Sequence, residues 1–209
     1  MDFMSVLGSP QARQILAETQ MDKYKGYADI HNKLQAEISA LSPEDWRRNL
    51  YMGTLDVIRS LFTSYKERQP FQANDAWEYR QLLSGLGSWT GLRHDTILYA
   101  KQPYGVLKGM GRPQAPPKAI AYVEPEPELF ARLASLTGMI LNSLGELGLR
   151  ASLSEEVRER LVGLQAMAMQ LLSISIKQLE QKELSAEELE YLEKLPVHLA
   201  RVQGKDEDD

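Results

Sequence analysis

Apolar residues recur at intervals of three and four along most of the chain, which is the spacing of one face of an α-helix. The clearest run consists of Tyr27, Ile30, Leu34, Ile38 and Leu41, and similar runs begin at Trp46, Leu129 and Val157. Strand-like sequence is confined to the short AIAYV segment at 119–123, which is suited only to edge pairing. The pattern predicts an all-α protein, a compact multi-helix bundle of about seven helices.

Helix starts are marked by serine, proline and acidic residues in the expected order. A serine oxygen caps free backbone N–H groups, proline suits the first helical position, and acids in the first turn complement the helix dipole. Such starts lie at Ser9-Pro10, at Ser42-Pro43, and in the capping-box patterns Ser152 to Glu155 and Ser185 to Glu188. Pro196 is predicted to end or kink the last helix.

The stretch 103–127 interrupts the helical pattern, because it holds most of the ten prolines of the chain. Such a composition indicates a crossover or a linker. Its apolar residues favour a crossover ordered by packing against the helices; they are Tyr104, Val106, Leu107, Ile120, Tyr122 and Val123. The sequence predicts a single all-α domain over 1–203 that includes this crossover, followed by an acidic disordered tail over 204–209.

One segment, 84–105, is apolar nearly all round and yet carries charged residues. The helix over 76–102 is therefore predicted to be the most buried element, with Leu86 and Trp89 inside. Arg93 falls in the middle of the apolar arc, where a guanidinium needs a carboxylate or several carbonyls. The favoured interpretation is a buried ion pair, with Glu37 or the backbone carbonyls of 103–123 as acceptors, and the alternative is an anionic ligand.

Small residues on the same helix, at Ser84, Gly87 and Gly91, share one narrow face. Glycine lowers helix propensity, and at this spacing it lets a second helix approach closely. We therefore expect tight helix packing there, with backbone approach to a ligand as the alternative.

The ligand-binding candidates are Arg93, His94, Trp89, Lys101 and Tyr104. Adjacent residues on a helix point about 100° apart, so Arg93, His94 and Asp95 do not form a catalytic cluster on their own. For His94 a hydrogen-bonded place at the edge of the core is favoured over ligation. No catalytic residue and no metal ligand is assigned, because the three histidines, His31, His94 and His198, lack the spacing of a metal site.

Composition excludes several classes of function. A formal charge of −5 argues against a nucleic-acid surface, which is normally basic. The absence of cysteine removes thiolate catalysis and cysteine-held metals or clusters, and no nucleotide-binding or hydrolase motif occurs, so no cofactor is expected. No run of 18 apolar residues is present, which predicts no membrane span, and the first residues do not form a signal peptide.

Three segments resemble a bacterial and archaeal family catalogued as domain of unknown function thirty-one-sixty: 42–61, 74–105 and 121–140. The most specific parts are the SW-x-x-LRHDTILYAKQ core at 88–102 and the YVEP turn at 122–125. The resemblance implies a helical part of a longer, exported and often lipid-anchored protein, and hence an extracytoplasmic location. It implies no activity and no catalytic residues.

Taken together, these observations favour a non-enzymatic helical scaffold or binding domain of an exported protein. Its expected partners are the remaining portions of a longer parent chain or another protein. The alternative is a hydrolase-type or anionic-ligand-binding domain that uses Arg93 and His94. A concave pocket reached by these polar groups would distinguish the two hypotheses.

Overall fold

The protein is helical throughout the part described by its computed structural model, residues 1–63, 70–96, 122–149 and 153–204. These residues form ten α-helices and two short 3-10 helices, with no strand among them. The α-helices are α1 (Asp2–Val6), α2 (Pro10–Glu18), α3 (Tyr27–Ser39), α4 (Pro43–Trp46), α5 (Leu50–Ser60), α6 (Asp75–Thr96), α7 (Pro127–Glu146), α8 (Glu155–Leu179), α9 (Ala186–Glu193) and α10 (Leu195–Gln203). The 3-10 helices are η1 (Met21–Lys23) and η2 (Pro70–Gln72). The predicted all-α fold is confirmed, with more and shorter helices than expected.

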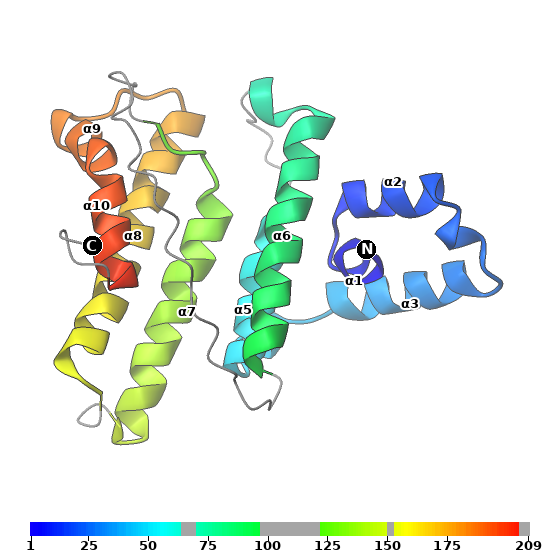
Figure 1. The fold of residues 1–209 in the computed structure, drawn as a ribbon, viewed down its shortest axis with the longest axis horizontal. Helices are drawn as coiled ribbons and strands as arrows, with labels where there is room; N and C mark the ends of the chain where they lie inside the picture. Colours follow the sequence, from blue (N-terminus) through cyan, green and yellow to red (C-terminus); the bar gives the residue numbers. More distant parts are fainter. Residues whose placement is uncertain (64–69, 97–121, 150–152, 205–209) are drawn as a thin grey trace, which may run out of the picture.

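Helices α5, α6 and α7 lie in the middle of the molecule, and α8 lies beside α7 (Figure 1). Helix α5 packs against both α6 and α7, and α7 packs along α8. The N-terminal helices α1, α2 and α3 lie at one end, where α1 and α2 contact α6. Helices α9 and α10 lie at the opposite end, where α10 covers α8.

Several helices begin where the sequence predicts. The Ser9 hydroxyl accepts a hydrogen bond from Ala12 N at 3.2 Å in front of α2. Complete capping boxes open α4 at Ser42 and α9 at Ser185. The prediction for Pro196 is also confirmed, because α9 ends at Glu193 and α10 begins at Leu195. These starts depend on residues within one helical turn, which explains why the sequence alone locates them.

Two helices differ from expectation, one in where it ends and one in how it is capped. The helix that opens at Ser42 ends after four residues, and Asn49 caps a new helix, α5, by accepting from Met52 N at 2.9 Å. The cap of α8 is Ser154, which accepts from Val157 N, rather than a box from Ser152 to Glu155. Glu155 is instead the first residue of α8, and Ser152 lies outside the described residues.

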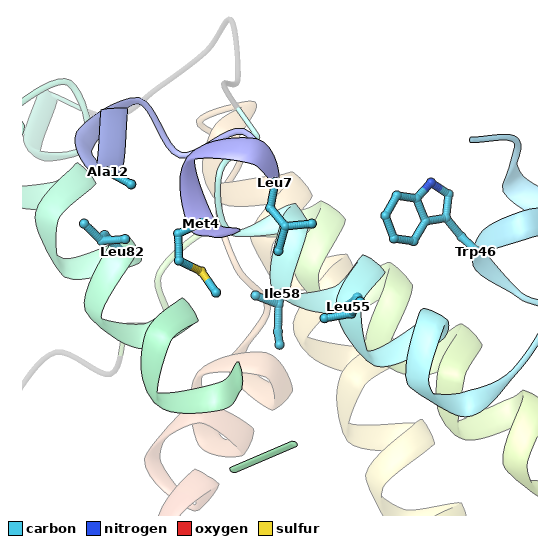
Figure 2. Packing of buried hydrophobic residues seen from close by; sticks show 7 residues of the cluster. All are labelled: Met4, Leu7, Ala12, Trp46, Leu55, Ile58 and Leu82. Carbon is cyan, nitrogen blue, oxygen red and sulfur yellow. The ribbon is translucent and has the colours of Figure 1, made fainter. Parts of the chain in front are cut away.

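The first buried cluster joins the N-terminal helices to the middle of the molecule (Figure 2). Met4 of α1 and the following Leu7 point toward Leu55 and Ile58 of α5 and Leu82 of α6. Ala12 of α2 and Trp46 of α4 complete the set. A second cluster lies at the other end and consists of Met167, Leu171, Ile174 and Leu192.

Helix α6 is not the most buried element, so that prediction is wrong. It buries one face, with Trp77, Gln81, Leu82 and Gly85, and leaves Leu83 exposed. Leu86 and Trp89 are partly buried against the first cluster rather than enclosed. The apolar arc of α6 is wider than the surface that α1, α2 and α5 cover, and the rest of it faces water.

The small-residue face at Ser84, Gly87 and Gly91 does not receive a neighbouring helix. All three residues are exposed, and no described atom lies within 4 Å of a Cβ built at Gly87 or Gly91. The close approach occurs at Gly85, where a Cβ would lie 2.9 Å from Cζ of Phe62. The prediction of tight helix packing at Ser84, Gly87 and Gly91 is therefore wrong.

The predicted crossover 103–127 falls largely outside the described residues; only its last part, from 122, is described. This part packs on η2 and the first half of α6. Tyr122 meets the ring of Phe71 edge to face, with centroids 6.0 Å apart, and Glu124 pairs with Arg80. The Gln72 side chain donates to the carbonyl of Pro125 at 3.3 Å. The YVEP segment thus fixes the approach of the chain to α7.

A helix that crosses a bilayer needs about 20 predominantly apolar residues. None of the described helices is both long enough and apolar enough to cross a membrane.

Candidate functional site

The predicted site around Arg93 lies at the exposed end of α6. The Arg93 guanidinium lies 5.4 Å from the centroid of the Trp89 ring, and Phe3 of α1 stacks on the same ring with centroids 4.9 Å apart. His94 Nδ1 lies 3.2 Å from Asp95 Oδ1, and both side chains are mostly exposed.

The predicted buried ion pair of Arg93 is wrong. Arg93 is exposed, Glu37 is exposed on α3, and no described carboxylate lies within ion-pair distance of the guanidinium. Arg93 lies one turn beyond Trp89 and next to Leu92, which packs against the first cluster, whereas Arg93 itself is exposed. His94 is likewise at the surface rather than at the edge of the core. The remaining candidates, Lys101 and Tyr104, lie outside the described residues, and a ligand-binding role for the set remains a prediction.

A different group of polar residues lines a groove of about 340 Å³ between α4, α5 and α7. We call it the arginine groove. We define it by its charged lining residues and one tryptophan: Trp46, Arg47, Asp56, Arg59, Glu128 and Arg132. Apolar side chains such as Leu41, Leu136 and Met139 form other parts of its wall. Its volume falls within the range of small-molecule sites, about 300–1,000 Å³.

The groove exists because α5 and α7 come close at Gly53. A Cβ at this position would lie 2.8 Å from Leu136 Cδ1 and 3.1 Å from Met139 Cε. Residues three and four apart share a helix face, so the spacing places Gly53, Asp56 and Arg59 together on α5. The same rule places Glu128 and Arg132 together on the facing side of α7.

An ion-pair network joins the two helices across the groove. Asp56 is the centre of the network. The Asp56 side chain accepts hydrogen bonds from Arg132 and from Arg59, the latter at 3.1 Å. The backbone carbonyl of Asp56 accepts a further hydrogen bond from Arg132 at 3.1 Å. Arg132 Nε lies 3.3 Å from Glu128 Oε2. The side chains of Asp56, Arg59 and Arg132 are each between about a fifth and a third exposed. The network therefore holds α5 to α7 as well as lining the groove.

Trp46 gives the groove an aromatic wall. The Arg59 guanidinium lies over its ring at 4.6 Å from the centroid, a cation–π arrangement. Trp46 itself is 3% exposed, and its indole N–H has no hydrogen-bond partner among the described residues. Arg59 Nε is also buried without an acceptor there. These two N–H groups are covered by protein atoms, so they are not open to a ligand in the groove.

The charge of the groove is positive although the chain as a whole is acidic. Three arginines face two carboxylates, and the carboxylates pair with Arg59 and Arg132. Arg47 is exposed and has no ion pair among the described residues. Guanidinium groups bind carboxylate and phosphate oxygens in a forked geometry, so the arrangement suits an anion. No group of three or more residues able to hold a metal ion occurs in the described part of the chain.

Sequence reasoning missed the arginine groove. Asp56 and Arg132 are separated by 76 positions, so the pair follows from the packing of α5 on α7. The local signals were the pairs Asp56 with Arg59 and Glu128 with Arg132, each at helical spacing. Such pairs are common on solvated helix faces and do not by themselves indicate a site.

The family described as "Protein of unknown function (DUF3160)" matches residues 1–209. The chain belongs to this family. No curated protein and no solved structure matches the chain. Within this DUF3160 chain, the described part of the SW-x-x-LRHDTILYAKQ core, 88–96, lies in the second half of α6, and the YVEP segment lies just before α7. Membership therefore confirms the resemblance and brings no assigned activity.

Proposed function

We propose that this DUF3160 chain is a non-enzymatic binding domain that holds an anionic ligand in the arginine groove. The observation that carries the proposal is the surplus of arginine: three guanidinium groups and two carboxylates line one groove, and Arg47 is left without an ion pair among the described residues. A ligand oxygen anion would supply the missing acceptor.

The lining supports binding rather than turnover. The charged groups of the groove other than Arg47 are already engaged in ion pairs, which fix their positions. Groups held in this way favour recognition of a fixed shape and charge. Asp56 and Glu128 both pair with arginine, so their oxygens already accept guanidinium N–H groups.

The earlier alternative, anion binding by Arg93 and His94, has less support. Both side chains are exposed at the end of α6, and His94 already contacts Asp95. An extracytoplasmic location, implied by the resemblance, is retained as part of the proposal. Compartment-specific labelling of the natural full-length protein in its own cell would test it.

The proposal is tested by adding citrate, a tricarboxylate, to the protein labelled with ¹⁵N at its three tryptophans. Trp46→Phe identifies the Trp46 indole N–H signal. We expect a saturable shift of this signal and little change at Trp77, because Trp77 does not line the groove. Glycerol, a neutral polyol, should leave all three signals in place. A Trp46 signal that does not respond to citrate or to inorganic phosphate would contradict the proposal.

A further inference from the structure

A second cavity, of about 130 Å³, lies among the N-terminal helices and shares no residue with the arginine groove. We call it the N-terminal cavity. Its lining includes Ser5 of α1, Arg13 and Leu16 of α2, Asp22 of η1, and Tyr27 and His31 of α3. A cavity needs roughly 10–15 Å³ of such volume to hold one water, so this one has room for a small ligand of several non-hydrogen atoms.

A buried polar pair forms the inner wall of this cavity. Ser5 is 2% exposed and His31 is 5% exposed, and Ser5 Oγ lies 2.8 Å from His31 Nε2. The Tyr27 ring stacks on His31 with centroids 5.7 Å apart, and the Tyr27 hydroxyl donates to Asp2 at 3.0 Å. These contacts fix the imidazole between α1 and α3. Helix α3 buries this histidine while Ile30 and Leu34 of its apolar stripe stay exposed.

Opposite charges line the same cavity without pairing with each other. Arg13 makes one long hydrogen bond, 3.4 Å, to the neutral side chain of Gln35. Neither Arg13 nor Asp22 has an ion pair among the described residues. A positive group from α2 and a negative group from η1 that line one small cavity match a ligand that carries both charges. The Leu16 side chain adds apolar wall between α2 and α3.

We infer that the N-terminal cavity binds a small zwitterion, an amino acid. Its carboxylate would pair with Arg13, whose fork of N–H groups suits carboxylate oxygens, and its ammonium would pair with Asp22. The carbon skeleton would lie against Leu16 and the stacked rings of Tyr27 and His31. This inference is independent of the proposed function, because it concerns other helices and other residues.

The test is a titration of the ¹⁵N-labelled full chain with glycine, L-alanine and γ-aminobutyrate, followed by two-dimensional NMR. We expect at least one of them to cause saturable shifts at Ala28 and His31, in the millimolar range, and none at the second buried cluster. Acetate and methylammonium, which carry one charge each, should not reproduce the effect at equal concentration.

The variants Arg13→Gln and Asp22→Asn should each weaken this binding at least tenfold. Both side chains are exposed, so the fold should be kept, as the unchanged signals of α8 would verify. Lys25→Gln, at an exposed position outside the lining, is the matched control and should bind like the parent. The inference is overturned if none of the three amino acids binds, if acetate alone gives the same shifts, or if both variants bind like the parent.

Discussion

At the scale of single residues, the Glu188 carboxylate combines two interactions. Its carboxylate accepts from Ser185 N at 2.9 Å as part of the capping box of α9. It also accepts from Lys177 of α8 at 2.6 Å. The hydrogen bond from Lys177 is the main cause, and the bond from Ser185 the next, of a Glu188 pKa below its ordinary value of 4.5. Glu188 therefore links α9 to α8 through its charge.

We predict that Glu188→Gln lowers the free energy of unfolding by about 1 kcal/mol at pH 7, a modest value because Lys177 is partly exposed. The folded pKa is lowered, so this contribution is present above pH 4.5 and is lost as the pH falls through the folded value. Urea unfolding at pH 7 and pH 3 measures it. Glu187→Gln, next to it and exposed, is the control. A difference between Glu188→Gln and the parent that is equal at both pH values would contradict the account.

Asp56 is a second residue whose substitution should lower the free energy of unfolding. Asp56→Asn removes the carboxylate shared by Arg59 and Arg132, which are partly buried, and should cost about 1–3 kcal/mol of stability. Glu128→Gln removes a more exposed partner of Arg132 and should change stability by less than about 0.5 kcal/mol. Thermal unfolding of the two variants, which change the net charge equally, checks this. Equal losses would show that Asp56 is not the centre of the network.

At the scale of elements, α6 shows which features of a helix the apolar pattern of the sequence determines and which it does not. The sequence predicts that α6 exists and approximately where it begins, because periodicity and helix-start signals are local. It does not predict which part of the apolar arc is covered, since that depends on where α1, α2 and α5 lie. Arg93 was therefore placed in the core while it stacks on Trp89 at the surface.

Two glycines of α6 provide a matched test of this packing. Gly85→Ala should destabilise the protein by about 1–3 kcal/mol, because the new methyl would lie 2.9 Å from the Phe62 ring. Gly87→Ala should stabilise it by about 0.5–1 kcal/mol, since no described atom lies within 4 Å and alanine favours the helix. Denaturant midpoints measure both. If Gly87→Ala were the more harmful substitution, the covered face of α6 would have been assigned incorrectly.

At the scale of the whole molecule, two buried clusters are connected through the packing of α5 on α7. The arginine groove lies at this joint, and it was beyond sequence reasoning because its two sides come from distant parts of the chain. A single domain over 1–203 remains a prediction. The overall charge of −5 repels anions, so any anion that binds must be attracted by the local surplus of arginine.

The most direct test of the arginine groove compares citrate binding by Arg47→Gln and Arg48→Gln. Both residues are exposed neighbours, and both substitutions lower the net charge by one unit, but only Arg47 lines the groove. Titration calorimetry at low ionic strength should therefore show that Arg47→Gln binds citrate about tenfold more weakly than the parent, which is the size expected for the loss of one charged hydrogen-bond partner. The affinity of Arg48→Gln for citrate should be nearly unchanged. Equal affinities for the two variants would contradict an anion site in the arginine groove.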